Sequence, residues 1–234
     1  MLADLWPTYR LRITTPRVQL RLPDESELAE LAALAGRGIH APSERPFLTP
    51  WTDGTAEDRA RSVLRGYWGQ LSSWDVDDWR LGLGVFATDG QPLGMVTLRA
   101  RDFRVVREVT TSSWLGLDHQ RQGFGTQARL GLLVLAFDHL GAEAALTEVF
   151  QDNAASQGVS RRLGYEPDGI SRDARGGEVL VSDRLRLRRS TWDGREHAGV
   201  VVAGVDACAA LFGASRQVTG PGANAGRHAG PDQR

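Results

Sequence analysis

The chain has 234 residues, of which 41% are hydrophobic, and its formal net charge is −1, so it can bury one good core and is expected to form one domain, or one domain with a short appendage. Acidic and basic residues are well mixed, which argues against a nucleic-acid-binding surface and against a polybasic membrane anchor. No stretch approaches about 18 apolar residues, and the single Cys208 excludes an intramolecular disulfide and fits a reducing compartment, so we expect a cytoplasmic protein.

The first half of the chain predicts a strand, two helices and then a meander of strands. Residues 10–22 predict the opening strand, and Asp24 with Glu27 forms the capping box of the helix that follows. Glycines and prolines interrupt residues 36–54, which therefore predict a long loop, and Thr55 caps the second helix. Further strands are predicted at 79–88, 93–101 and 109–117.

A glycine-rich turn follows the last of these strands. The sequence Gln120-Arg121-Gln122-Gly123-Phe124-Gly125-Thr126 lies between that strand and an apolar-faced helix at 127–140. At such a turn, unpaired backbone N–H groups and the positive helix end converge, and glycine lets an anion approach the main chain. The turn therefore predicts a binding site for a ligand that carries phosphate.

Two common phosphate-binding motifs fit this turn less well. A nucleoside triphosphate loop requires Gly-Lys before Ser or Thr, whereas Gly125 is followed by Thr126 and Gln127. The dinucleotide fingerprint is a closer rival, because residues 123–128 fit G-x-G-x-x-A and Glu148 lies about where the ribose-binding acid would be. However, five residues separate the strand from the first glycine, and only one strand–helix–strand unit is visible. A nicotinamide or flavin oxidoreductase is therefore the remote alternative.

Three segments in this order resemble the acyl-CoA N-acyltransferases of the GNAT superfamily. They are Gln-x-x-Gly-x-Gly at 120–125, the strand at 145–150 followed by Asp152-Asn153-Ala154-Ala155-Ser156, and Arg162-Leu163-Gly164-Tyr165. Residues 15–21 resemble the opening strand of the branch that contains ribosomal-protein N-terminal acetyltransferases. The resemblance implies an α/β (α+β) fold whose mixed, mostly antiparallel sheet has about seven strands, a splayed parallel pair and flanking helices.

The remainder of the chain predicts two more strands, at 165–171 and 178–189. We expect the acyltransferase domain to span 1–195 and an appendage at 196–213 to pack on it. Residues 214–234 are rich in Gly, Ala and Pro and predict a flexible tail.

The resemblance implies that acetyl-CoA or succinyl-CoA binds in the gap of the splayed pair, without a metal. Pantetheine amides would pair with main-chain groups around 114–117, and the pyrophosphate would rest on amides of 121–126. Asn153 would serve pantetheine, or cap the next helix, or do both. The expected donor-binding residues are Trp114, Leu115, Leu117, Gln120, Arg121, Gln122, Gly123, Phe124, Gly125, Thr126, Asn153 and Ser156.

The implied chemistry is direct attack of a neutral amine on a thioester in a ternary complex, assisted by a general base. Glu148 lies five residues before Asn153, where one group of GNAT ribosomal-protein acetyltransferases has its base. Burial in an apolar strand would strengthen Glu148 as a base, whereas the alternative is a strand-face Glu paired with an arginine. Glu178 and Asp183 are the reserve candidates.

The leaving group is the thiolate of CoA, which many members of the superfamily protonate with a tyrosine in the helix after Asn153. Counted from Asn153, that position is Ser160 in this chain, which departs from the pattern. A serine hydroxyl can still donate a hydrogen bond to sulfur or relay a proton from water. Tyr165 is a second candidate, although its place after Leu163-Gly164 favours a core position.

The acyl group is not fixed by the superfamily. The motif at 112–117 and the loop at 46–51 look most like an actinobacterial GNAT succinyltransferase. A succinyl carboxylate would need a cationic or multiple-donor pocket, for which Arg45, Arg99 and Arg101 are the candidates.

The acceptor is equally open and can be a protein N-terminus, a lysine or a small amine. The loop at 36–54 carries Phe47 and Trp51, which we expect to flank the acceptor channel. The missing helix tyrosine and the appended C-terminus suggest a second class, a non-catalytic CoA-binding or protein-interaction module on the same fold. A homo-oligomer is left open.

Overall fold

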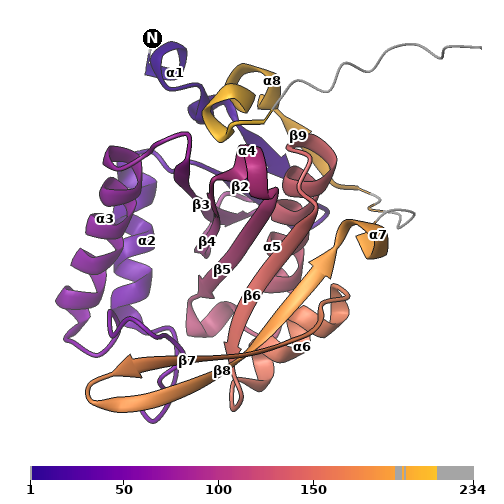
Figure 1. The fold of residues 1–234 in the computed structure, drawn as a ribbon. Helices are drawn as coiled ribbons and strands as arrows, with labels where there is room; N and C mark the ends of the chain where they lie inside the picture. Colours follow the sequence, from indigo (N-terminus) through magenta and orange to yellow (C-terminus); the bar gives the residue numbers. More distant parts are fainter. Residues whose placement is uncertain (1, 193–196, 198, 215–234) are drawn as a thin grey trace, which may run out of the picture.

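The computed structural model describes residues 2–192, 197 and 199–214, which form one nine-stranded sheet with helices on both faces (Figure 1). The strand order is β7-β8-β6-β5-β4-β3-β2-β1-β9. The strands are β1 Arg12–Thr14, β2 Val18–Arg21, β3 Asp78–Ala87, β4 Pro92–Arg101, β5 Glu108–Leu115, β6 Ala144–Phe150, β7 Glu166–Arg175, β8 Glu178–Arg188 and β9 Val201–Ala203. The helices are α1 Leu2–Leu5, η1 Pro7–Arg10, α2 Glu25–Arg37, α3 Ala56–Ser72, α4 Phe103–Val106, η2 Leu117–His119, α5 Phe124–Val134, η3 Leu135–His139, α6 Ala154–Arg162, α7 Arg189–Trp192, α8 Val205–Cys208 and η4 Ala209–Phe212.

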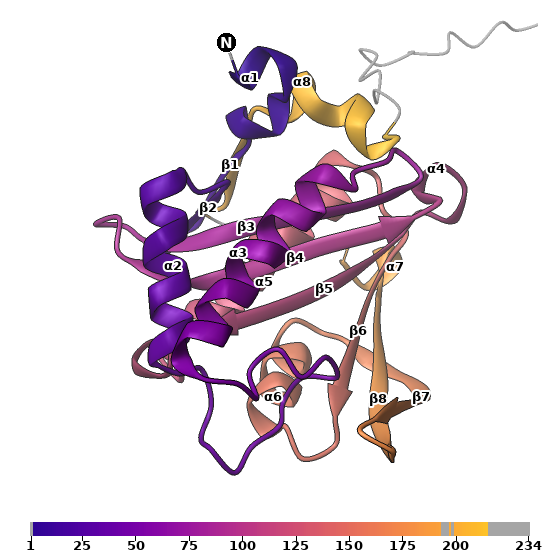
Figure 2. The same ribbon diagram turned by 90° about the vertical axis from the view of Figure 1, so that its left-hand side faces the viewer.

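The sheet is antiparallel except at one pair of strands. β5 and β6 run parallel, with residues 108–110 opposite residues 144–146. Parallel neighbours need a crossover connection, which α5 and the π-helical turn η3 provide. After these three register pairs the strands separate, and Figure 2 shows β6 diverging from β5. The predicted mixed, mostly antiparallel sheet with a splayed parallel pair is confirmed.

Small residues let the helices approach the sheet closely. A Cβ at Gly82 of β3 would lie 2.3 Å from the side chain of Gln70 in α3, so α3 packs against that face. A Cβ at Gly131 in α5 would lie 2.9 Å from the side chain of Ile13 in β1, so α5 packs on the opposite face (Figure 2). None of the helices in the described part of the chain is long and apolar enough to cross a membrane.

The opening strand predicted at 10–22 is two strands joined by a tight turn. The hydroxyl oxygen of Thr15 accepts hydrogen bonds from the N–H groups of Arg17 (3.3 Å) and Val18 (3.1 Å). Pro16 lies between Thr15 and Arg17. It has no N–H to donate to a neighbouring strand, so the chain reverses there. This division, together with β9, gives nine strands in place of the expected seven.

Residues 199–214 return to the edge of the sheet near the N-terminus. β9 pairs antiparallel with β1, and the indole N–H of Trp79 donates to the carbonyl of Phe212 at 3.1 Å. Cys208 and Phe212 are fully buried. The flexible tail predicted at 214–234 begins with a buried Ala214 and otherwise lies outside the described residues.

Candidate active site

The glycine-rich turn connects β5 to α5. Gly123 is the N-cap residue of α5 and has a left-handed conformation with a φ of 87°, and Arg121 is left-handed as well, with a φ of 59°. The first N–H groups of a helix have no intrahelical partner, so they are free to bind a ligand at this corner. A side chain at position 123 would be strained, because this φ favours glycine.

The start of α5 fits a phosphate group. A Cβ at Gly125 would contact only the side chain of Leu115, at 3.6 Å, so a ligand can approach the main chain there. The hydroxyl oxygen of Thr126 is buried and has no hydrogen-bond partner among the described residues. A buried polar atom without a partner is costly, and a phosphate oxygen could accept a hydrogen bond from this hydroxyl. The helix end, the open glycine and this hydroxyl together suit an anion.

Arg17 also belongs to the turn, although it lies 105 residues before its hydrogen-bond partner. Its guanidinium donates to the carbonyl of Gln122 and lies over the ring of Phe124, 4.6 Å from the centroid. The turn therefore carries an extra positive charge. Sequence reasoning missed Arg17, because only the packing of the β1–β2 hairpin beside α5 brings it there.

Two predicted donor-binding glutamines use their side chains to hold the loop. The Nε2 of Gln120 donates to the carbonyls of Ile39 (2.7 Å) and Leu115 (2.9 Å), and the Nε2 of Gln122 donates to the carbonyl of Asp118 (2.7 Å). These bonds fix the shape of the turn. A ligand at the turn would therefore contact the main chain between 121 and 126 and not these two side chains.

The gap between β5 and β6 opens at Thr111. The hydroxyl of Thr147 in β6 donates to the carbonyl of Thr111 at 3.3 Å, just past the last register pair. From 112 to 115, the edge of β5 that faces β6 has no strand partner among the described residues. Such an edge can pair with the amides of an extended ligand, as a peptide does when it extends a sheet. Trp114 and Leu115 lie half-buried on this stretch, and the side chain of Leu117 beyond it is exposed.

Asn153 caps α6. Its Oδ1 accepts a hydrogen bond from the N–H of Ser156 at 3.0 Å, which satisfies one of the unpaired donors of the first turn. The capping role considered for Asn153 is therefore present in the structure. Contact of Asn153 or Ser156 with pantetheine stays a prediction.

A buried polar cluster lies next to the opening of the gap, between α5, α6 and β5. Arg129 of α5 is 4% exposed, and its Nη1 donates to the Oγ of Ser160 at 2.9 Å. Ser160 is fully buried, and its hydroxyl donates to the carbonyl of Ser156 at 3.0 Å. The hydroxyl of Tyr165 lies 3.3 Å from that of Thr111. The cluster thus places Arg129 beside the position that the resemblance assigns to the leaving-group acid.

The two candidate acids for the leaving group are held inside this cluster. Ser160 has one hydroxyl proton, and that proton is directed at the carbonyl of Ser156. Tyr165 lies in the core, as its place in the sequence favoured, and burial raises the pKa of its hydroxyl. Neither geometry favours proton donation to sulfur.

Glu148 is exposed, so of the two environments considered for it, burial in an apolar strand is absent. It lies in β6 opposite Arg184 of β8, yet it has no hydrogen bond or ion pair to a described residue. Arg184 instead pairs with Asp168, at 3.2 Å. Side chains alternate along a strand and Thr110 is the register partner of Leu146, so Glu148 shares the sheet face of Trp114. This face is the one that α2 and α3 cover farther along the sheet.

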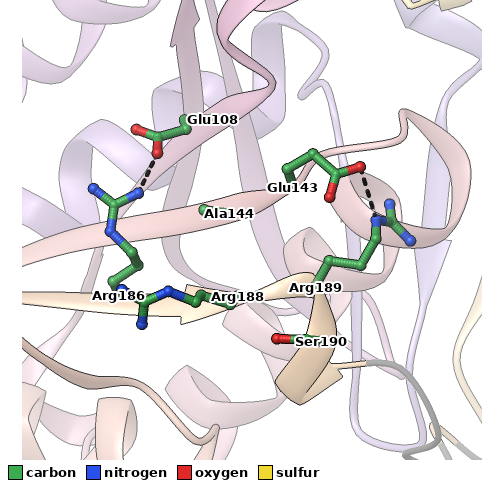
Figure 3. Close-up of a pocket in the computed structure, with 7 residues that line it drawn as sticks. All are labelled: Glu108, Glu143, Ala144, Arg186, Arg188, Arg189 and Ser190. Carbon is green, nitrogen blue, oxygen red and sulfur yellow. Dashed lines mark hydrogen bonds and ion pairs between the residues drawn. The ribbon is translucent and has the colours of Figure 1, made fainter.

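A hollow of about 320 Å³ extends the face of Glu148 toward the start of β6 (Figure 3). Arg186 is ion-paired there with Glu108, and Arg189 with Glu143 at 3.4 Å. Ala144 lies between the two pairs. Arg188 also lines the hollow, and its ion-pair partners Glu166 and Asp168 lie outside the lining, so the hollow is polar with an excess of guanidinium groups.

An aromatic row connects the loop between α2 and α3 to β5. The ring centroids of Phe47 and Trp51 are 5.2 Å apart, and those of Trp51 and Trp114 are 5.9 Å apart. The row therefore brings the two residues expected at the acceptor channel next to a residue expected at the donor. A contact of Phe47 or Trp51 with an acceptor stays a prediction.

The reserve carboxylates lie away from the open face of β6. Asp183 accepts hydrogen bonds from the amides of Gln151 and Gln157, both at 2.9 Å, and so points toward α6. Glu178 is exposed at the start of β8. Within the described ranges, no group of three or more His, Cys, Asp or Glu side chains could hold a metal ion.

The three candidate arginines for an acyl carboxylate differ in position. Arg45 is exposed, and Arg101 is exposed and ion-paired with Asp78 at 3.0 Å. Arg99 is half-buried in β4 opposite Thr110 of β5, so it shares the face of Glu148. Arg99 is level with the last register pair of β5 and β6, one strand away from the gap, and Arg101 is on the same face but farther from the gap.

Residues 17–166, more than half of the chain, match the acetyltransferase (GNAT) domain. The chain therefore belongs to the GNAT acetyltransferase family.

Solved structures share the fold. Mycobacterium smegmatis RimJ in complex with a CoA disulfide is 15% identical, with a TM-score of 0.66, and the match covers 86% of this chain and 94% of that one. RimL, a ribosomal L7/L12 α-N-protein acetyltransferase in complex with coenzyme A, is 16% identical, with a TM-score of 0.59 and coverage of 76% and 97%. A GNAT-family acetyltransferase from Bacillus anthracis is 11% identical, with a TM-score of 0.58 and coverage of 76% and 99%. At these identities the likeness concerns the fold alone.

Proposed function

We propose that this chain is an N-acetyltransferase that transfers an acetyl group from acetyl-CoA directly to an amine in a ternary complex. The observation that carries the proposal is the gap between β5 and β6, with the glycine turn at its end and Glu148 exposed beside it on the face of the sheet opposite α5. A donor that enters from the turn and an amine that enters from the face of Glu148 would meet in this gap. Direct attack then needs no covalent enzyme intermediate.

The donor would bind by its phosphates and its amides. The N–H groups at the start of α5, the hydroxyl of Thr126 and the guanidinium of Arg17 are suited to the pyrophosphate. The unpaired edge of β5 is suited to the amides of pantetheine. The presence of coenzyme A in the RimL structure of the same fold supports CoA as the ligand.

The exposure of Glu148 favours an α-amino group as the acceptor. An α-amino group has an ordinary pKa of about 7.7 to 8.0 and is roughly a tenth neutral at pH 7, whereas lysine, at about 10.4, is neutral about once in two thousand. The difference amounts to about 3 to 4 kcal/mol. A solvent-exposed carboxylate acting through water is a modest base, which suffices for the first amine and not for the second. The α-N-protein acetyltransferase RimL offers a parallel on the same fold.

Succinyl-CoA is the second candidate donor. Arg99 favours it, because this half-buried guanidinium shares the face of Glu148 and has no ion pair with a described carboxylate. A charge-assisted bond to the succinyl carboxylate would satisfy Arg99. Acetyl-CoA is proposed as the main donor, since the family is one of acetyltransferases.

The test is turnover by the full chain with acetyl-CoA and succinyl-CoA, corrected for hydrolysis. The acceptors are matched peptides with a free N-terminus and no lysine, or with a blocked N-terminus and one lysine, together with small amines. We expect acetyl transfer to the free α-amino group to exceed transfer to lysine by at least about tenfold. A clear preference for succinyl-CoA would overturn the choice of donor. Tight binding of CoA without turnover on any acceptor would favour the non-catalytic module.

A further inference from the structure

Arg129 is a buried cation without a carboxylate partner. Its side chain lies in the interior, 4% exposed, and the Oγ of Ser160 is a neutral acceptor. Its Nε has no hydrogen-bond partner among the described residues. Tyr165 is the one described titratable group close enough to act on it, and burial lowers the pKa of Arg129. Arginine keeps its charge even so, and an unpaired buried charge is costly unless a ligand compensates it.

The neighbours of Arg129 locate it at the reacting end of the donor site. Ser160 is the residue that stands where the resembled family has its leaving-group acid, and Arg129 bonds to it directly. Tyr165, its other neighbour, contacts the hydroxyl of Thr111, the first residue of β5 past the parallel register. Arg129 also lies five residues, about 7.5 Å of helix, beyond the start of α5 at Phe124. An arm bound by its phosphates at that helix end would therefore extend toward the guanidinium.

We propose that Arg129 is a catalytic residue that binds the sulfur of CoA and stabilises it as a thiolate when the acyl group leaves. This inference rests on the proposed function of the gap. A guanidinium suits the role because it stays charged at every pH at which the reaction runs, and it is less strongly hydrated than an ammonium group. Ser160 is then a positioning residue, which holds one Nη of the guanidinium and leaves the Nε to the ligand.

The step balances without a protein acid. The lone pair of the amine forms the new C–N bond, and the C–S bond breaks with its electron pair on sulfur. The proton of the amine passes to water or to Glu148. The sulfur remains an anion against Arg129 until the product leaves and solvent protonates it. The ordinary pKa of a free cysteine thiol is near 8.5, and the thiol of CoA is likewise a weak acid, so the positive charge of Arg129 favours its ionised form.

The experiment compares binding of CoA with binding of desulfo-CoA, which lacks the sulfur. Calorimetry at pH 6.5 and pH 9 is carried out on the wild type, Arg129→Met and Arg129→Lys, with Arg161→Met, an exposed arginine of α6, as the control for loss of charge. We expect the wild type and Arg161→Met to prefer CoA over desulfo-CoA by about tenfold or more at pH 9, the scale of one charge-assisted hydrogen bond, and by less at pH 6.5. Arg129→Met should lose this preference, and Arg129→Lys should keep part of it.

Other results would contradict the proposed role of Arg129 or the proposed function of the gap. Equal weakening of CoA and desulfo-CoA in Arg129→Met would make Arg129 a structural residue and overturn the inference. If Arg129→Met does not fold, Arg129→Lys and Ser160→Ala are measured instead. The proposal requires that both variants show a smaller preference for CoA over desulfo-CoA than the wild type. If the wild type binds neither ligand, the donor site itself is wrong, and the proposed function fails with the inference.

Discussion

The guanidinium of Arg175, near the tip of the β7–β8 hairpin, holds both carboxylate oxygens of Asp53, 122 residues earlier, at 2.6 and 2.7 Å. The same guanidinium donates to the carbonyl of Phe47 at 2.9 Å. Both contacts to Asp53 come from Nη2, and hydrogen bonds between two charged groups are stronger than those between neutral ones. This pair joins the hairpin to the loop that carries Phe47 and Trp51. The two segments therefore close one end of the face on which Glu148 lies.

Replacing Arg175 should affect the acceptor and spare the donor. Arg175→Met removes the three hydrogen bonds and frees the loop, so we expect the KM for the amine to rise by about fivefold or more, while the Kd of CoA changes by less than about twofold. Steady-state kinetics and calorimetry measure the two quantities. Arg172→Met, an exposed arginine of the same strand, is the matched control. A parallel loss of CoA affinity in Arg175→Met would show that the pair supports the donor site instead.

Gly125 offers a cleaner test of the turn than Gly123. At Gly123 the positive φ of 87° strains any side chain, so a folding defect would confuse the result. At Gly125 a Cβ meets only Leu115, at 3.6 Å, so Gly125→Val should fold and obstruct the phosphates. We expect the affinity for CoA to fall by about 100-fold or more, measured by calorimetry. Gly66→Val, at an open position in α3, controls for the change in helix propensity when valine replaces glycine. Wild-type affinity in Gly125→Val would remove the pyrophosphate from this turn.

Trp51→Ala should change the KM for the amine more than the affinity for CoA. Its ring lies 5.2 Å from that of Phe47 and 5.9 Å from that of Trp114, so its loss loosens the loop and exposes a residue at the donor gap. We expect a rise in the KM for the amine of about tenfold and a smaller fall in CoA affinity. Trp68→Ala is the control, because Trp68 is 56% exposed on α3. If the affinity for CoA changes by a larger factor than the KM for the amine, the aromatic row belongs to the donor site.

The helix starts were predictable because a capping box is local. Asp24 accepts from the N–H of Glu27 while Glu27 reaches back to the N–H of Asp24, and Thr55 makes the same reciprocal pair with Asp58. All the atoms involved lie within four residues, so sequence spacing determines them. The glycine turn is of the same kind, since a strand, two glycines and an apolar helix follow one another directly.

The charged partners of the site were not predictable from spacing. Arg17 reaches the turn from 105 residues away, and Arg129 meets Ser160 across 31 residues, so only the packing of β1–β2, α5 and α6 brings them together. The exposure of Glu148 was not predictable for a related reason. Alternation indicates which side chains share a face, but it does not say whether another element covers that face. α6 packs on the side of β6 that carries Val149, and the side of Glu148 is exposed.

Cys208 should react slowly with thiol reagents in the folded chain. Its side chain is fully buried, and burial raises the pKa of the thiol to about 11. Only the thiolate is the nucleophile, and at pH 8 the raised pKa leaves about one thiol in a thousand ionised. We expect alkylation, followed by mass spectrometry, to be at least about 100-fold slower than in the urea-unfolded chain. Equal rates in the two states would mean that the segment around η4 opens readily.

Glu148→Gln tests the base. The change keeps the shape of an exposed side chain, so stability and the Kd of CoA should be unaffected. Turnover should fall by about 10²- to 10⁴-fold, the range for loss of a general base. The loss should be greater for a strongly basic amine than for a weakly basic one, because an amine that is already neutral has less need of proton removal.

Glu178→Gln, which changes an exposed carboxylate of β8, is the matched control and should turn over at the wild-type rate. Full activity in Glu148→Gln with a loss in Glu178→Gln would transfer the role to Glu178, and full activity in both would leave Asp183 or solvent to take the proton.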